Sequence, residues 1–416
     1  MTFSRTSGTI SRLILCLCIC ASMFSSVHAQ RISILNNKFV VGGSQIFILG
    51  ANTPWNSWND FGGSFSPSWW NTHFSTMHNN GLNATRVWIT CNGANSSPGI
   101  DANGLVSSPT QAFWTNVDSL FSIARKNQIY LMIALISFDH VKTGNTNADR
   151  WVKMFASATN RASFVDNYAV PFVQRYNANP YFFSIDVGNE LDWAYENYGV
   201  THNNLFDLVA RVANGVHANS QVLVTLGTGA GPKYCSTVYI DGNWYSDASL
   251  QALQSGAYLD FYNDHFYEWM TPYFSTPFDK SPADWGISEK PCLIGEYAAS
   301  GAGGYTPQQC LDKAYSLGWQ GVMPWTSNGV DGCGSLSNFG TVFSTFRAAH
   351  PSLFPSATAQ RMPQKVQHQA TGKAEIMMFD ILGRIVKPSS LQRQHGMAVT
   401  IVRSKETCRR ILEIDR

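Results

Sequence analysis

Eight short apolar runs recur between residues 46 and 324 of the chain, and longer amphipathic segments separate them. The runs cover residues 46–50, 84–89, 130–135, 183–187, 222–226, 259–262, 292–295 and 321–324. Segments with helical periodicity lie between them at 111–127, 161–177, 203–219 and 307–317. Strands that alternate with helices pair in parallel, and eight such units favour an α/β fold of the (β/α)8 barrel type over an open sheet.

The chain has room for more than this barrel. A (β/α)8 barrel takes about 250 residues or more, and the chain has 416. We assign residues 30–355 to the barrel, which opens with a predicted hairpin at 32–41 and carries 16 Lys and Arg against 22 Asp and Glu. The polar stretch 356–372 has no sustained period and is interpreted as a linker. Residues 373–416 alternate like short strands and predict a small C-terminal β-rich module.

Residues 1–29 have the pattern of a secretory signal peptide. Arg5 and Arg12 precede an apolar run over 13–23, and the following Val27-His28-Ala29 fits a cleavage site after Ala29. The apolar run is shorter than the ~20 residues that a bilayer span requires. We therefore predict a secreted, extracellular protein with no membrane span, with attachment to the cell surface as a variant of this location.

The cysteines and histidines do not have the spacing of a metal site. Of nine cysteines, three lie in the signal peptide, and the remaining six are Cys91, Cys235, Cys292, Cys310, Cys333 and Cys408. Five of these lie in the predicted barrel, so at least one thiol there is expected to be unpaired. Neither a C-x-x-C nor an H-E-x-x-H pattern occurs, and we expect no metal and no cofactor.

Two of the predicted strands lead directly into a glutamate. The fourth run continues to Glu190 and the seventh to Glu296, and side chains at the C-terminal ends of barrel strands carry the chemistry of such folds. One such glutamate alone is most simply a salt-bridged structural residue. A pair matches glycoside cleavage, in which one carboxylic acid protonates the leaving oxygen and one carboxylate attacks; a narrow barrel mouth holds them ~5 Å apart, which favours retention of configuration.

Other strand ends offer partners for this pair. Arg86 could hold the nucleophilic carboxylate ionised, and Asn189 could hydrogen-bond a sugar hydroxyl. His265 and Tyr267 point the same way because they are two residues apart in an extended segment. Trp325 follows the eighth run, where an indole can stack on a pyranose, although each of these residues also has an ordinary structural interpretation.

Together these motifs resemble glycoside hydrolase family 5, in the clan of retaining (β/α)8 enzymes. The resemblance covers about residues 30–355 and implies Glu190 as acid/base and Glu296 as nucleophile. It further implies that Arg86 and Tyr267 support the nucleophile. The sugar beside the cleaved bond would be bound by Asn189, His265 and Trp325. The family often has a histidine after the third strand, for which His140 is the candidate here.

The opening of the barrel resembles the β-mannanases of that family more than its cellulases. The segment Phe47-Ile-Leu-Gly-Ala-Asn-Thr-Pro-Trp55-Asn-Ser-Trp58 carries this similarity, which implies plant β-mannan or a related polysaccharide as substrate and an endo-1,4-β-mannosidase activity. Trp55 and Trp58, with further loop tryptophans, are candidates for stacking sugars along an open cleft. An endo-β-1,4-glucanase remains the alternative, because one sequence does not reveal how loops read the 2-hydroxyl.

The C-terminal module resembles the sorting domain of the type IX secretion system. Asp380-Ile-Leu-Gly-Arg384 is followed by a Gly-led strand and a basic last strand. This similarity implies a bacterial secretion machinery as partner and removal or surface attachment of the tail. A carbohydrate-binding role is disfavoured because residues 373–416 contain no Trp or Tyr.

Other classes of function have less support. A glycan-binding barrel that has lost catalysis would lack one carboxylate, whereas both are present. No G-x-S-x-G occurs, and the glycines of 227–231 are too few to indicate a nucleotide site. We expect a monomer that binds no nucleic acid.

Overall fold

The computed structural model describes residues 30–94, 97–239 and 242–355, and the backbone of strands at 375–379, 385–386, 399–404 and 407–412. The predicted signal peptide 1–29 and linker 356–372 lie outside the described residues. The chain divides into two compact units, Met1–Gln360 and Arg361–Arg416.

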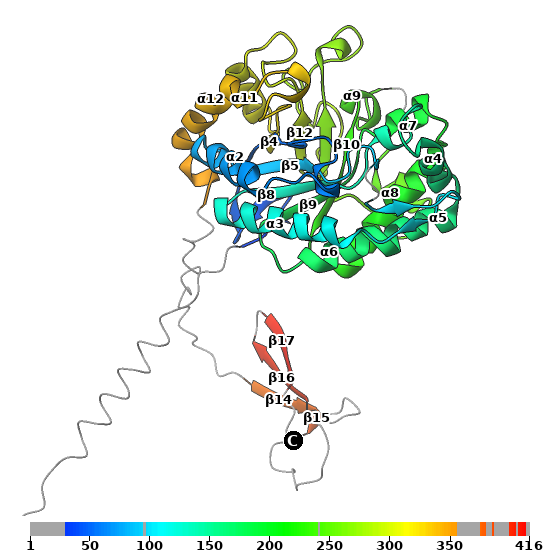
Figure 1. Ribbon diagram of the computed structural model, residues 1–416. Helices are drawn as coiled ribbons and strands as arrows, with labels where there is room; N and C mark the ends of the chain where they lie inside the picture. The colour runs from blue at the N-terminus through cyan, green and yellow to red at the C-terminus, as the bar shows by residue number, and fades with distance from the viewer. Residues whose placement is uncertain are drawn as a thin grey trace, which may run out of the picture. The chain divides into compact units, whose positions relative to one another are not determined.

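Eight parallel strands close into a barrel, which confirms the predicted fold class (Figure 1). The strands are β4 (Ile48–Asn52), β5 (Ala84–Trp88), β8 (Tyr130–Ala134), β9 (Phe182–Asn189), β10 (Leu223–Thr228), β11 (Tyr262–His265), β12 (Cys292–Glu296) and β13 (Gly321–Val322). They pair in chain order, and β13 closes the ring by pairing with β4. Parallel strands buried on both faces need near-continuous apolar sequence, which explains the eight runs.

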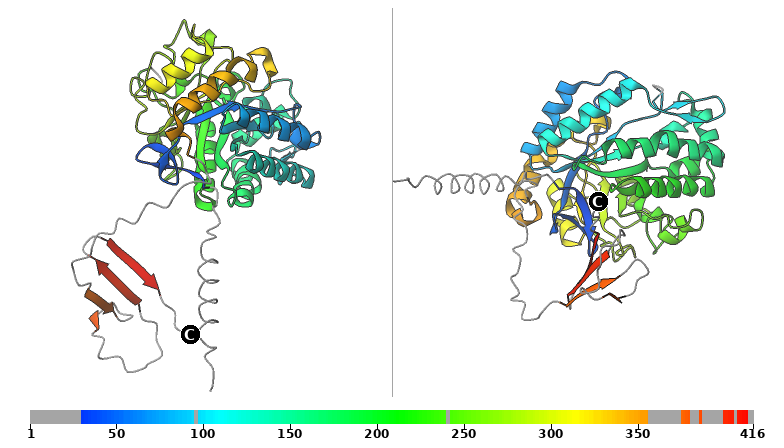
Figure 2. Two further views of the ribbon diagram at one scale, coloured as in Figure 1. Left: turned by 90° about the vertical axis from the view of Figure 1, so that its left-hand side faces the viewer. Right: turned by 90° about the horizontal axis from the view of Figure 1, so that it is seen from below.

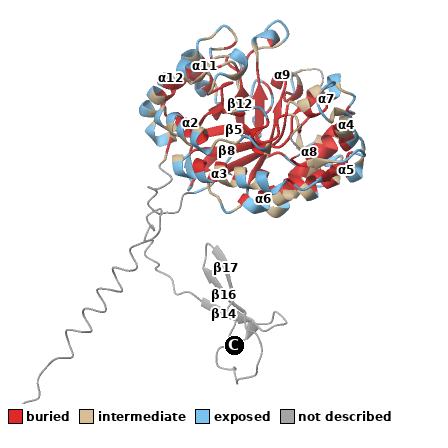
Figure 3. Cartoon of the chain, in the orientation of Figure 1, coloured by how far each residue is buried: buried red, intermediate tan, exposed pale blue. Residues whose placement is uncertain are grey.

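Helices surround the strands and supply the outer layer. They include α2 (Pro67–Asn79), α3 (Gln111–Asn127), α4 (Ala148–Ala156), α5 (Ala158–Phe164), α6 (Val170–Tyr176), α7 (Asp192–Asn197), α8 (His202–Asn219), α9 (Gly231–Tyr234), α10 (Asp247–Gln251), α11 (Pro307–Ser316) and α12 (Leu336–Ala349). Figure 3 shows the strands buried and the outward faces of the helices exposed. Their starts are encoded locally: Thr306 and Gln309 form a capping box at α11, with Pro307 in the first turn.

A small antiparallel sheet covers the end of the barrel where the strands begin. It consists of β1 (Ile32–Leu35), β2 (Lys38–Val41) and β3 (Ser44–Gln45), the first two forming the predicted hairpin (Figure 2). Phe39 packs edge-on against Phe183 and Phe261, with ring centroids 5.5 and 5.1 Å apart. Arg31 donates to the carbonyl oxygens of Asn177, Asn179 and Phe182. This sheet therefore closes one end of the core and leaves the other end for the site.

Among the elements that differ from their predicted extents, two are changed most. The segment predicted as one helix over 161–177 is α5, a π-helical turn η3 (Val165–Ala169) and α6 in succession. The sixth strand begins at Tyr262, where the predicted run ends, so that Asp264 and His265 belong to the strand itself. The apolar pattern missed this part of β11 because its residues are polar, although the strand is buried along its whole length.

The remaining expectations concern thiols, membranes and the tail. All five cysteines of the described barrel, Cys91, Cys235, Cys292, Cys310 and Cys333, are free. Among the described residues, no helix combines the length and apolar character that crossing a membrane requires.

In the tail, β14 (Glu375–Phe379), β15 (Ile385–Val386), β16 (Val399–Ser404) and β17 (Thr407–Leu412) form one antiparallel sheet in the order β15-β14-β16-β17.

Candidate active site

The two predicted glutamates meet at the C-terminal end of the barrel. Glu190 directly follows β9, and Glu296 is the last residue of β12. His265, the last residue of β11, lies between them, with Nδ1 2.9 Å from Glu190 Oε1 and 3.5 Å from Glu296 Oε1. One donor atom from each of these three residues lies within 4.8 Å of the other two. The two carboxyl groups are therefore close neighbours at the barrel mouth.

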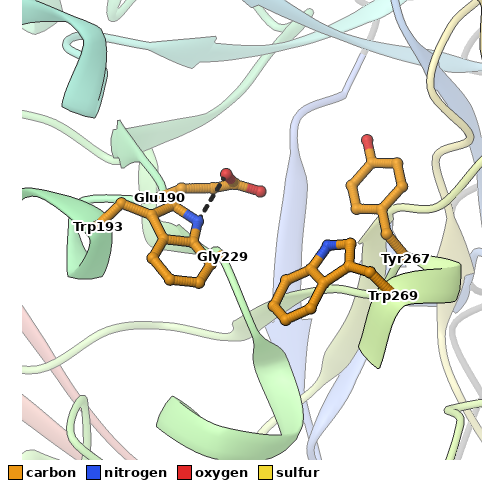
Figure 4. Close-up of a pocket in the computed structure, with 5 residues that line it drawn as sticks. All are labelled: Glu190, Trp193, Gly229, Tyr267 and Trp269. Atoms are coloured by element: carbon orange, nitrogen blue, oxygen red, sulfur yellow. Dashed lines mark hydrogen bonds between the residues drawn. The ribbon is translucent and has the colours of Figure 1, made fainter. Parts of the chain in front are cut away.

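Glu190 is held in a specific and strained conformation. Its φ of 51° lies in the left-handed region, which costs a non-glycine residue ~1–2 kcal/mol, and its backbone N–H donates to Gly227 O at 2.8 Å. Trp193 Nε1 donates to Glu190 Oε2 at 3.1 Å (Figure 4). Residue 229 must be glycine for this contact, since a Cβ there would lie 2.2 Å from Trp193 Nε1. The surrounding loops thus aim the carboxyl into the mouth.

Glu296 has a different set of partners. Arg86 Nη1 donates to Oε1 at 2.6 Å, and the Tyr267 hydroxyl donates to Oε2 at 2.8 Å. Only 3% of Glu296 is exposed. A carboxylate that accepts two such bonds, one of them charge-assisted, is stabilised as an anion and fixed in orientation.

Arg86 organises the base of the site. It is fully buried, and besides Glu296 it donates to Asp186 Oδ2 at 2.7 Å, Asn52 Oδ1 at 3.0 Å and Asn189 Oδ1 at 2.9 Å. A buried guanidinium requires such compensation, because an unpaired buried charge is strongly destabilising. Through this one side chain, residues from β4, β5, β9 and β12 share a hydrogen-bond network.

Burial shifts the proton equilibria of the site. It raises the pKa of Glu190 to about 7, against a smaller opposing effect of Arg86. Burial also raises the pKa of Glu296, but His265 and Arg86 both oppose it. For His265, burial lowers the pKa to about 4, so the imidazole is neutral at pH 7. Because Arg86 and Tyr267 contact Glu296 and not Glu190, Glu190 is the group that carries the proton near neutral pH.

Two adjoining cavities form a cleft across the mouth. One, of about 590 Å³, is lined by Glu190, Trp193, Gly229, Tyr267 and Trp269 (Figure 4). The other, of about 420 Å³, is lined by Trp55, Trp58, Trp88, Phe138, Asp139, Lys142, Asn189, Glu190, Tyr267, Glu296, Trp325, Asp331 and Cys333. Glu190 and Tyr267 belong to both, so the cleft continues on either side of the carboxyl pair.

The predicted stacking residues lie on the Glu296 side of this cleft. Trp325 packs against Trp55 and Trp88, with ring centroids 5.9 and 5.3 Å apart, and donates from Nε1 to Asp331 at 3.3 Å. Trp58 packs edge-on against Trp55 and is 41% exposed. These indoles are thus available as an aromatic wall next to the carboxyl pair.

His140, unlike the other predicted site residues, neither lines the cleft nor bonds to one of the two glutamates. It is buried, stacks edge-on against Trp151 at 4.8 Å, and its Nδ1 accepts from the Ser137 backbone N–H. Its neighbours Phe138 and Asp139 line the cavity instead. The short helical turn η2 (Phe138–His140) turns the imidazole into the core.

Three donors at the centre are close enough to hold a cation: Glu190, His265 and Glu296. The Arg86 guanidinium, however, already places a positive charge 2.6 Å from Glu296. The second oxygen of Glu296 is occupied by Tyr267. The donor set is thus engaged within the protein, and its chemistry is that of an ion pair and hydrogen bonds.

Sequence reasoning missed two residues that support the site. Asp186 is fully buried in β9 and accepts from Arg86, Gly188 and Gly227. Asn52 ends β4, accepts from Arg86, and donates to the carbonyls of Gly295 and Met323. A charged or amide residue inside an otherwise apolar run was the available signal, because such a group needs a buried partner.

Comparisons with known proteins find sequence relatives and solved structures of similar fold. No model of a known protein family matches the chain. A mannan endo-1,4-beta-mannosidase from Cryptopygus antarcticus is 24% identical in an alignment of length 341 that covers 71% of this chain and 84% of that protein. The enzyme of the same name from Mytilus edulis is 24% identical in an alignment of length 343 that covers 74% of this chain and 92% of that protein.

The fold has close counterparts among solved structures. A beta-1,4-D-mannanase from Cryptopygus antarcticus matches with a TM-score of 0.68 and 22% identity, over 76% of this chain and 94% of that one. This likeness shows the (β/α)8 fold. The two sequence relatives, together with the carboxyl pair, identify the chain as a glycoside hydrolase.

Proposed function

We propose that the protein is a secreted, retaining endo-β-1,4-mannosidase of glycoside hydrolase family 5. The observation that carries the proposal is the unequal surrounding of two adjacent carboxyl groups: Arg86 and Tyr267 contact Glu296, whereas Trp193 contacts Glu190. Retaining enzymes hold their carboxyl groups ~5–5.5 Å apart and inverting enzymes ~6.5–9.5 Å apart. A separation of at most 4.8 Å between oxygens of the pair supports retention.

The reaction takes two displacements. Glu296 attacks the anomeric carbon while Glu190 gives its proton to the leaving oxygen, so a C–O bond to Glu296 forms as the glycosidic C–O bond breaks. Glu190, now ionised, then removes a proton from water, which attacks the same carbon and releases Glu296. A pKa of about 7 for Glu190 suits a group that must be an acid in the first step and a base in the second.

The cleft and the relatives support the substrate. Aromatic rings lie on both sides of the carboxyl pair, with Trp193 and Trp269 on one side and Trp55, Trp58 and Trp325 on the other. A cleft that is open past the cleavage point accepts the interior of a chain, which supports endo action. We choose mannan as the proposed substrate because both sequence relatives bear the name mannan endo-1,4-beta-mannosidase.

Two substitutions test the assignment. Glu190→Ala and Glu296→Ala are each expected to abolish hydrolysis of soluble mannan and to leave the protein folded, because each removes a reacting group. Glu196→Ala, at an exposed acid on α7, is the matched control and keeps full activity. Wild-type activity in either site variant would refute the roles. A panel of mannan, glucomannan, carboxymethyl-cellulose and xylan separates a mannanase from an endoglucanase.

The chain ends support export. We assign residues 1–29 to a cleaved signal peptide and the C-terminal module to sorting by a type IX secretion system, after which the module is removed or attached to the surface. The basic composition of residues 356–416, with 11 Lys and Arg against 5 Asp and Glu, sets it apart from the acidic barrel segment.

A further inference from the structure

His265 sits where it can serve both glutamates but not a sugar. The side chain has no exposed surface, so a substrate in the cleft cannot touch it as it stands. Its Nδ1 lies 2.9 Å from Glu190 Oε1 and 3.5 Å from Glu296 Oε1. One ring nitrogen is therefore within reach of both carboxyl groups.

The surroundings of the other ring nitrogen decide where the proton lies. Nε2 has no hydrogen-bond partner among the described residues. It lies against Gly227 beside Arg86: a Cβ at Gly227 would be 2.6 Å from Nε2 and 3.0 Å from Arg86 Nη2. An N–H at Nε2 would have no acceptor and would lie near the Arg86 guanidinium, whereas a lone pair at Nε2 is compatible with a neighbouring cation. We therefore assign the single proton of the neutral imidazole to Nδ1, facing the carboxyl pair.

We propose that His265 is a positioning residue whose one N–H follows the negative charge of the reaction from Glu296 to Glu190. This inference rests on the proposed function. Before attack Glu296 carries the charge; once the bond to the sugar forms and Glu190 has given up its proton, Glu190 carries it. The pair holds one negative charge in both states. Nδ1 is 2.9 Å from Glu190 Oε1 and 3.5 Å from Glu296 Oε1, so a movement of 0.6 Å (3.5 − 2.9) gives Glu296 the short contact that Glu190 has here.

The other charged groups that face His265 cannot play this part. Arg86 donates to Glu296 and is anchored by Asp186, Asn52 and Asn189 at distances of 2.7 to 3.0 Å. The Tyr267 hydroxyl donates to the other oxygen of Glu296, Oε2. Both donate their hydrogen bonds to Glu296, and Arg86 acts on Glu190 only through space. Of these three groups, His265 alone lies within 4 Å of both carboxyls, so its N–H can move from one to the other.

The test compares His265→Leu with His265→Asn, because the Asn amide can place an N–H where Nδ1 stands. In the Leu variant both limbs of the kcat/KM pH profile on mannan move to higher pH, since each carboxylate has lost a donor, and kcat falls about 10- to 100-fold. In the Asn variant both limbs of the pH profile lie closer to their wild-type positions than in the Leu variant, and part of the lost kcat is restored. Titration of ¹³C-labelled glutamate carboxyls in the three proteins shows the same two upward shifts without relying on activity.

Two results would overturn the inference. A rise in KM alone, with both limbs unmoved, would make His265 a sugar contact after all. Equal damage in both variants with unmoved carboxyl titrations would make its role structural. If the wild-type protein hydrolyses no β-glycan, the proposed function fails, while the carboxyl titrations still decide whether one N–H serves both glutamates.

Discussion

At the scale of the residue, the site separates two chemically identical side chains by their contacts. Glu296 accepts hydrogen bonds from the guanidinium of Arg86 and the phenol of Tyr267, and Glu190 accepts one from the indole of Trp193. Because charge-assisted bonds stabilise a carboxylate more than a neutral N–H does, the proton resides on Glu190 and the negative charge on Glu296. The proposed division of labour between acid and nucleophile rests on this difference.

Tyr267→Phe tests the support of the nucleophile. It removes only the hydroxyl that donates to Glu296 at 2.8 Å. We expect the acidic limb of kcat/KM to move to higher pH and kcat/KM at the optimum to fall about tenfold or more, since a hydrogen bond to a charged group is lost. Circular dichroism should show an unchanged fold. An unmoved acidic limb would contradict the assigned role.

Glu190→Gln tests the burial of the acid. The pKa of Glu190 is raised from 4.5 to about 7, so the folded protein binds its proton more tightly than the unfolded chain. Stability is therefore lost as pH rises from about 4.5 to about 7, by up to ~3 kcal/mol. The free energy of unfolding of the Gln variant should exceed that of wild type by an amount that grows over this range and is constant above it. A difference that does not depend on pH would refute the shift.

At the scale of the element, most of the barrel was predictable and parts of the site were not. Strands buried on both faces leave a continuous apolar signature, so the runs ending at Glu190 and Glu296 could be read directly. The end of β11 is polar although buried, and its extent depends on hydrogen bonds to neighbouring strands that no local pattern records.

The same limit applies to single side chains within elements. Asp186 could not be paired with Arg86 because the two are 100 residues apart and meet only when β5 and β9 lie in one barrel. His140 follows the third strand as the resemblance implies, but the turn η2 directs it inward against Trp151. Sequence position fixes the strand end at which a residue lies, whereas the local turn fixes where its side chain points.

Phe39→Ala tests the element that covers the far end of the barrel. Phe39 is fully buried and packs against Phe183 and Phe261. Its loss should lower the free energy of unfolding by about 3–5 kcal/mol in urea or thermal unfolding. Because the sheet lies opposite the site, kcat/KM at low temperature should stay at the wild-type value. Lys38→Ala, at the exposed neighbouring position, is the control and should change neither. A large loss of activity in folded Phe39→Ala would contradict this independence.

At the scale of the whole molecule, two units of opposite charge lie on one chain. Residues 30–355 carry a net charge of −6 and residues 356–416 one of +6. The cleft and its carboxyl pair belong entirely to the first unit. We propose that the second unit serves export and not catalysis.

The mass of the protein exported by its native host tests this division. If the C-terminal module sorts the chain and is then removed, the exported protein should begin at Gln30 and lack the module, as intact-mass spectrometry would show. Its specific activity on mannan should equal that of the full chain made in another host. An exported protein that retains residues 356–416 unmodified would count against sorting and removal.

The most direct test of the central claim is to trap the sugar on the nucleophile. In Glu190→Ala, a β-mannobioside with a dinitrophenyl leaving group can react without an acid, but water then has no base to activate it, so the glycosyl-enzyme should accumulate. Peptide mass spectrometry should find one mannobiosyl group on the peptide that contains Glu296. A label on another residue, or no covalent adduct while the dinitrophenol is released, would contradict the account.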